Sequence, residues 1–77
     1  MREFTRIELA SFTGIDGKPA YIAYRRKVYD VSNSFLWKNG SHQALHDAGR
    51  DLTEELDKAP HGADLLVRVP VIGRLRD

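Results

Sequence analysis

The three histidines are the residues of this chain best suited to chemistry, and all lie in its second half. Neutral imidazole is a common ligand for metal ions in proteins. His42 and His46 are four residues apart, so on a helix they would share one face. His61 forms a second local site, between Pro60 and Gly62. Histidines from two such sites can approach one metal ion, or one heme iron, from both sides.

Apolar residues accompany these histidines along the sequence. Gly62 lacks a side chain, so a flat and bulky ligand can come close to the backbone beside His61. A heme needs axial ligands for its iron and an apolar slot for its macrocycle. The side chains predicted to line such a slot are Leu36, Trp37, Leu45, Leu52, Leu56 and Leu65.

Two other interpretations of the histidines stay open at this point. Many histidines are surface or capping residues that bind no ligand. A histidine pair at this spacing, with a third ligand, can also hold zinc. The residue after His42 is Gln43, however, so the helical motif that supplies zinc proteases with a general-base glutamate is absent. The apolar surroundings favour heme over zinc.

Composition narrows the classes of function. The chain has 77 residues, 12 basic and 11 acidic, with a net charge of +1 and no cysteine. This balance argues against a nucleic-acid surface or a polybasic membrane patch, and no disulfide can reinforce so small a core. No segment reads as a signal peptide or as a membrane span. We expect one domain over residues 1–77, cytoplasmic and monomeric, that binds a cofactor and is not an enzyme.

The first half of the chain predicts a small sheet. Thr5 and Glu8 have the spacing of a capping box, which opens a short helix with Ile7, Leu9 and Ala10 as its apolar positions. Asp16-Gly17 is a typical hairpin turn. Residues 20–24 and 27–31 read as two strands joined at Arg25-Arg26.

The second half predicts short helices around the histidines. Ser41 can cap a helix that runs to about Ala48 and ends at Gly49. A second helix begins at Asp51 or Leu52 and ends before Pro60. A third carries Leu65, Leu66 and Val69 and stops at Pro70, and residues 71–75 form a closing strand. The fold class is therefore α+β.

Several of these segments resemble the cytochrome b5-like heme/steroid-binding domain. They are KVYDVS at 27–32, AGRDLTEEL at 48–56, the His-Gly at 61–62 and VPVIGRL at 69–75. The resemblance extends from about Phe4 to Leu75. It implies a cytochrome b5-like fold, in which a small β-sheet and short helices frame a heme b pocket. It also places His61 where that family has its second axial ligand.

The first axial ligand departs from the family pattern. The usual His-Pro-Gly-Gly is missing, and the corresponding position falls on Trp37, which cannot bind iron. Residues 37–42 are similar to the membrane-associated progesterone receptor branch, which also lacks that motif and uses a tyrosine in a Gly-rich loop. By its position after Gly40, His42 is the best substitute, with His46 as the second choice. Trp37 would then form a pocket wall, and Tyr29 could direct its hydroxyl toward the cofactor.

This resemblance implies one-electron transfer with a redox partner protein. Iron bound by His42 and His61 has no open position, which suits a change of oxidation state rather than oxygen chemistry. The alternative is a binding or carrier module, either for a steroid-like apolar molecule or for heme without a redox role. A small zinc-binding domain is the third possibility.

Overall fold

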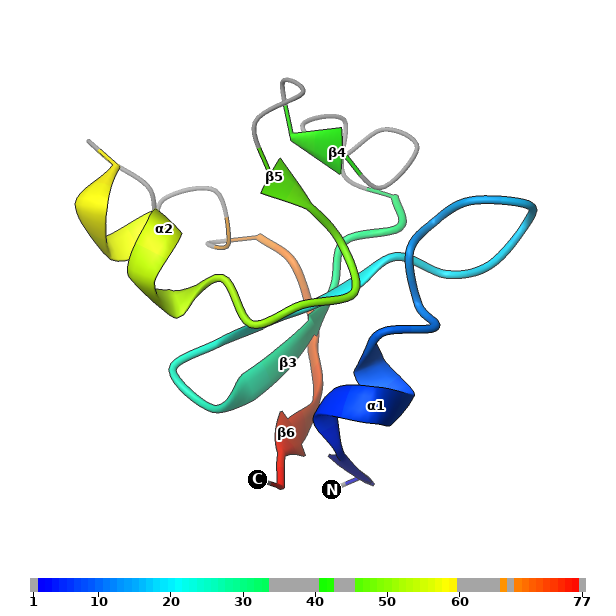
Figure 1. The fold of residues 1–77 in the computed structure, drawn as a ribbon, viewed down its shortest axis with the longest axis horizontal. Helices are drawn as coiled ribbons and strands as arrows, with labels where there is room; N and C mark the ends of the chain where they lie inside the picture. The colour runs from blue at the N-terminus through cyan, green and yellow to red at the C-terminus, as the bar shows by residue number, and fades with distance from the viewer. Residues whose placement is uncertain (1, 34–40, 43–45, 60–65, 67, 77) are drawn as a thin grey trace.

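Four strands form the mixed sheet at the centre of the fold (Figure 1). The computed structural model describes residues 2–33, 41–42, 46–59, 66 and 68–76, with the backbone alone at 41–42 and 46–47. The sheet order is β1-β6-β3-β2, and the strands are β1 (Arg2–Phe4), β6 (Val71–Leu75), β3 (Lys27–Asp30) and β2 (Tyr21–Tyr24). β1 runs parallel to β6, and the other pairs are antiparallel. The first and last strands are thus neighbours, and the two termini lie at the same end of the molecule.

The two tight turns predicted in the first half of the chain are present in the structure. Asp16 and Gly17 both have positive φ, 57° and 80°, as a tight hairpin turn requires. Arg25 and Arg26 also both have positive φ, 50° and 69°, and connect β2 to β3. Both predicted turns, and the strands predicted at 20–24, 27–31 and 71–75, are confirmed.

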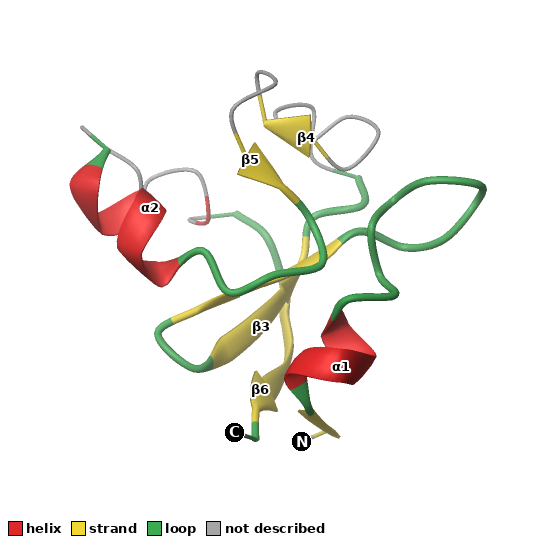
Figure 2. Cartoon of the chain, viewed as in Figure 1, coloured by secondary structure: helices red, strands yellow, loops and turns green. Residues whose placement is uncertain are grey.

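The two helices of the described residues are short (Figure 2), and their first turns are capped in different ways. Helix α1 (Arg6–Leu9) opens with the predicted capping box, because the Thr5 hydroxyl accepts from the Glu8 amide and the Glu8 carboxylate accepts from the Thr5 amide. Leu9 is buried, but Ile7, which was expected on the apolar face, is 87% exposed. A helix of one turn can turn only one of these side chains inward.

Helix α2 (Thr53–Lys58) is the predicted second helix. No side chain of its N-cap residue, Leu52, bonds to the helix. The carboxylate of Asp51 bonds to the first residue of the helix instead. It accepts hydrogen bonds from both the amide and the hydroxyl of Thr53, at 3.0 and 2.6 Å. Asp51 therefore caps this helix from one position before the ordinary N-cap.

The predicted helix from Ser41 to Ala48 is wrong. Residues Ser41–His42 form strand β4, His46–Asp47 form strand β5, and the two strands pair in an antiparallel ladder. An isolated helix of this length is marginal in water, so tertiary contacts decide the conformation. Gly49 has the expected positive φ of 91°, but it serves a close approach rather than a helix end, since a Cβ there would lie 3.3 Å from the Ala10 carbonyl oxygen.

The predicted third helix is also not found in the residues that can be compared. Leu66 has a 3-10 helical conformation, Arg68 lies in a turn and Val69 in a bend. None of the three belongs to an α-helix. The remainder of that prediction lies outside the described residues. Strand β1, conversely, was not predicted. Within the described part of the chain, no helix is long and apolar enough to span a membrane.

Alternation along the strands divides the buried residues between the two faces of the sheet. One face carries an aromatic core that packs against α1: Phe4, Leu9, Phe12, Tyr21, Ala23, Val28, Ile72 and Leu75. The other carries an aliphatic core that packs against α2: Ala20, Ile22, Val31, Ala48, Leu52, Leu56 and Leu66, with Tyr24, Tyr29 and Val69 at its border. Adjacent residues of β2 belong to opposite cores, as the two-residue period requires.

Candidate functional site

The aliphatic core is the part of the fold nearest in sequence to all three histidines. Ala48 is two residues after His46, and Leu56 and Leu66 stand on either side of His61 in the chain. All three belong to this one buried cluster. The segments that carry the histidines are therefore anchored, at their described ends, on the same face of the sheet.

The backbone brings His42 and His46 together in a way that the sequence did not predict. Their Cα atoms are partners in the β4–β5 ladder, so they oppose each other across two strands instead of following each other along a helix. This corrects the expected geometry and keeps both residues at one place in the fold. Both strands lie at the end of the molecule opposite the termini (Figure 1).

The side chains of three residues predicted to contact the cofactor can be located, two as lining residues and one through its hydroxyl. Leu52 and Leu56 are fully buried, with 0% and 1% of their surface exposed, and both belong to the aliphatic core. Tyr29 is half-buried at the border of the same core. The other candidates lie outside the described residues, namely Leu36, Trp37, Leu45, His61, Gly62 and Leu65.

The outer side of α2 carries a network that links it to the turn between β2 and β3. The Arg25 guanidinium donates to both carboxylate oxygens of Asp57 at 3.2 Å, and the Tyr24 hydroxyl donates to Asp57 at 2.5 Å. At the start of the helix, the Arg25 amide donates to the Thr53 hydroxyl at 2.9 Å. The hydrogen bond from Tyr24 and the charge of Arg25 lower the pKa of Asp57. The same hydrogen bond raises the pKa of Tyr24, because the Asp57 carboxylate accepts the phenol proton and so stabilises the protonated form.

This network was missed at the level of sequence. Tyr24 and Arg25 are separated from Asp57 by more than thirty positions, and no local pattern joins them. The one available signal was the Arg25-Arg26 pair itself, since a tight hairpin turn with positive φ at both positions normally uses Asn and Gly.

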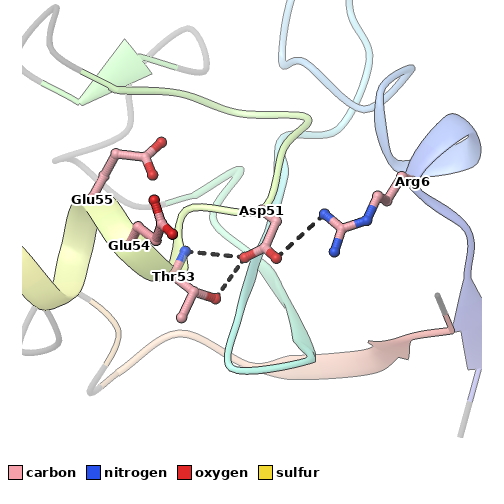
Figure 3. A pocket seen from close by; sticks show the side chains of 5 residues that line it. All are labelled: Arg6, Asp51, Thr53, Glu54 and Glu55. Atoms are coloured by element: carbon pink, nitrogen blue, oxygen red, sulfur yellow. Dashed lines mark hydrogen bonds and ion pairs between the residues drawn. The ribbon is translucent and has the colours of Figure 1, made fainter.

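A polar cleft of about 300 Å³ lies between Arg6 of α1 and the residues at the start of α2 (Figure 3). Its lining residues are Arg6, Asp51, Thr53, Glu54 and Glu55. Arg6 pairs with Asp51 at 3.4 Å, and Arg50 pairs with Glu55. These pairs account for much of the charge in the cleft. Among the described residues, no group of three or more His, Cys, Asp or Glu side chains has the geometry to hold a metal ion.

Comparison with known protein families identifies the fold. The sequence profile of the cytochrome b5-like heme/steroid binding domain matches residues 5–76. This chain belongs to that family. The match includes both described helices and every described strand except β1, so the cytochrome b5-like domain spans nearly the whole chain.

Solved structures of archaeal members are closely similar. A cytochrome b5 domain protein of Hadesarchaea is 58% identical over 99% of this chain and 100% of its own, with a TM-score of 0.91. A cytochrome b5 domain protein of Methanococcoides burtonii is 50% identical over 99% of both chains, with a TM-score of 0.93. A hypothetical Arabidopsis thaliana protein with a cytochrome b5-like fold shares the fold alone, at 21% identity and a TM-score of 0.74. No curated protein matches the chain.

The residues of this cytochrome b5-like domain fit a heme on two counts. The described members of the aliphatic core are aliphatic side chains with tyrosines only at the border, so no buried carboxylate or ammonium opposes an apolar macrocycle. The β4–β5 hairpin also supplies two imidazole-bearing residues at paired positions, and imidazole is an axial ligand of heme iron. A hydrated ion would gain nothing from such a lining.

Proposed function

We propose that this domain binds heme b through His42 and His61 and transfers single electrons to and from a partner protein. The observation that carries the proposal is the aliphatic core, which joins the described ends of the segments that bear these histidines. Membership of a heme/steroid-binding family supports it independently. Heme supplies an iron that takes up and releases one electron.

The residues of the chain have separate tasks in this proposal. His42 and His61 would hold the iron through their imidazoles, and the bound heme would supply one-electron chemistry. Leu52 and Leu56 exclude water from one side of the pocket, and burial is one of the properties that set the reduction potential of a heme. With both ligands supplied by the protein, oxidation and reduction of the bound heme would need little rearrangement of the chain.

The first experiment is a hemin titration followed by absorption spectra of the oxidised and dithionite-reduced protein. We expect a sharp Soret band and, on reduction, separated α and β bands of low-spin iron with two histidine ligands. A spectrum that does not differ from that of free hemin would contradict heme binding.

Single substitutions then identify the ligands. His61→Ala and His42→Ala should each abolish the low-spin spectrum, whereas His46→Ala should keep it. If His46→Ala loses the spectrum and His42→Ala keeps it, the first ligand is His46. If His61→Ala changes neither heme affinity nor spectrum, the proposed coordination is wrong.

The second candidate function is binding of a steroid-like apolar molecule, which the family description also includes. Two tyrosines border the aliphatic core, and the hydroxyl of Tyr24 is already bonded to Asp57. Tyr29 is therefore the described residue to test for a polar contact with such a ligand. Tight binding of an apolar steroid by the heme-free protein, weakened in Tyr29→Phe, would support this candidate against the first.

A further inference from the structure

Two contacts fix α2 to the turn between β2 and β3, one near each end of the helix. At the first residue, the Thr53 hydroxyl accepts from the Arg25 amide. One turn later, Asp57 accepts from the Arg25 guanidinium and from the Tyr24 hydroxyl. The Arg25 guanidinium also donates to the Tyr24 hydroxyl at 3.1 Å, which closes a ring of three side chains. Tyr24, Arg25 and Asp57 are called the α2 latch below.

Arg25 stands in a strained backbone conformation in the turn between β2 and β3. Arg25 and Arg26 have φ of 50° and 69°, a region that is unfavourable for any residue with a Cβ. Glycine or asparagine would adopt this turn at lower cost. Arg25 nevertheless occupies this position, and its guanidinium donates two hydrogen bonds to Asp57.

The latch holds the same helix that covers the aliphatic core. Leu56, beside Asp57 in α2, is buried in that core, and Leu52 lies directly before the helix. Tyr24 itself packs against the core while its hydroxyl reaches Asp57. Leu56 of α2 thus packs in the aliphatic core, while Thr53 and Asp57 tie the helix to the turn between β2 and β3.

We propose that the α2 latch positions the apolar wall formed by Leu52 and Leu56 and thereby controls how fast the domain loses its heme. This inference rests on the proposed function, because it assigns a role in retaining that ligand. Tyr24, Arg25 and Asp57 are positioning residues in this scheme, since they act through α2 and do not touch the ligand themselves. Opening the latch lets α2 move away from the sheet without breaking the strand pairs.

The chain contains a matched control for the latch. Arg74 pairs with Glu3 through two hydrogen bonds of 3.1 and 2.8 Å, and both side chains are largely exposed. This pair joins β6 to β1, the strand at the opposite edge of the sheet from β2, and α2 contacts β2. Glu3→Ala therefore removes an arginine–carboxylate pair of similar exposure that has no contact with the wall.

The experiment measures heme transfer to excess apomyoglobin and amide hydrogen exchange of the heme-free protein. We expect Asp57→Ala to release heme about tenfold faster than the wild type, as the loss of a charge-assisted hydrogen bond and an ion pair predicts. The amides of Thr53–Lys58 should exchange faster in the same variant, while those of β3 and β6 stay protected. Glu3→Ala should change neither heme release nor exchange in α2.

Tyr24→Phe is a milder variant in case Asp57→Ala folds poorly. It removes one hydroxyl and should release heme about threefold faster. Tyr21→Phe, on the same strand but in the aromatic core, is its control and should have no effect.

The outcomes separate this inference from the proposed function. A wild-type protein that takes up no hemin contradicts the proposed function, and the role of the latch with it. A wild-type protein that binds hemin, with Asp57→Ala and Tyr24→Phe both releasing it at the wild-type rate, would overturn the latch alone. Equal acceleration by Asp57→Ala and Glu3→Ala would also overturn it, because the effect would then be one of general stability.

Discussion

The two faces of the sheet are packed by different kinds of side chain. On the α1 face, Phe4 makes edge-to-face contacts with Phe12 and Tyr21 at centroid distances of 5.9 and 5.7 Å, and Phe12 stacks on Tyr21 at 4.5 Å. On the α2 face, the described core is aliphatic and its tyrosines stand at the border. The first and last strands both contribute to the aromatic core. No residue of either strand belongs to the aliphatic one.

This difference indicates a division of labour. Interlocking aromatic rings have fixed geometry and contribute beyond the area they bury, which suits a face whose task is to close the chain on itself. Aliphatic side chains make an apolar wall without directional demands, which suits the face that receives a planar ligand in our proposal. We therefore expect substitutions on the α1 face to act on stability alone, and substitutions on the α2 face to act on stability and ligand retention together.

The largest expected effect is that of Phe4→Ala in the aromatic core. Phe4 is fully buried and contacts two other rings. Its removal should cost about 3–5 kcal/mol of unfolding free energy. That loss is comparable to the whole stability of a domain of this size, about 3–5 kcal/mol, so the heme-free variant should be largely unfolded. Urea unfolding followed by circular dichroism tests this, and a loss under about 2 kcal/mol would contradict the role of the rings.

Leu56→Ala and Leu9→Ala compare the two faces directly. The two leucines are equally buried, at 1% each, and each lies on the helix that covers its own face. Each substitution should lower the unfolding free energy of the heme-free protein by about 2–4 kcal/mol. Leu56→Ala should also speed the loss of bound heme, and by more than Leu9→Ala does. Equal heme release by the two variants would mean that the two faces do not differ in function.

Thr5→Ala tests a local effect on the α1 face. It removes the hydroxyl that accepts from the Glu8 amide in the capping box. We expect a loss of about 1 kcal/mol in unfolding free energy, with the rate of heme release unchanged. Thermal unfolding and the heme-transfer measurement, made on the same preparation, check both parts.

The smallest expected effect is on the pH dependence of stability. Hydrogen bonds from Arg74 lower the pKa of Glu3, those from Thr5 lower the pKa of Glu8, and the bond from Tyr24 lowers that of Asp57. A carboxylate with a lowered pKa in the folded state stabilises the protein fully above its unfolded pKa near about 4, and this contribution is lost as the pH falls through the folded value. Stability should therefore decline below about pH 4.

The acid titration also separates the two faces. Glu3→Gln and Glu8→Gln should each flatten the acid limb of stability without altering heme release. Asp57→Asn should flatten it as well and also make heme release less dependent on pH. Urea unfolding and heme transfer measured from pH 6 to pH 3 give both curves. An unchanged acid limb in all three variants would contradict the assigned interactions.

Much of the fold could be predicted because its signals are local. The capping box of Thr5 and Glu8, the turn at Asp16-Gly17 and the hairpin around Arg25-Arg26 each depend on residues a few positions apart. The segment from Ser41 to Ala48 had an equally clear helical pattern, and that prediction failed. Its preference for helix is weak at this length, and the ladder of β4 with β5 and the close approach of Gly49 to Ala10 override it.

The candidate site also combines features that the sequence predicted with features that it did not. The sequence predicted Leu52 and Leu56 as lining residues of an apolar slot. Both are buried in the structure, and their contact with a ligand stays a prediction. The pairing of His42 with His46 across two strands did not follow from their spacing. The axial roles of His42 and His61 remain predictions that the spectra of the substituted proteins will test.

The sequence by itself determined the family, the turns, the central hairpin and the chemical character of the candidate site, because each depends on the types of residues that lie close together in the chain. Only the tertiary structure decided that β1 pairs with β6, that the two histidines lie on neighbouring strands, and that Arg25 and Tyr24 hold Asp57. Each of these joins residues whose approach depends on how the whole chain closes. Hydrogen bonds and packing between such distant segments form only once loop closure has been offset by burial of the two cores, and no short-range pattern encodes that balance.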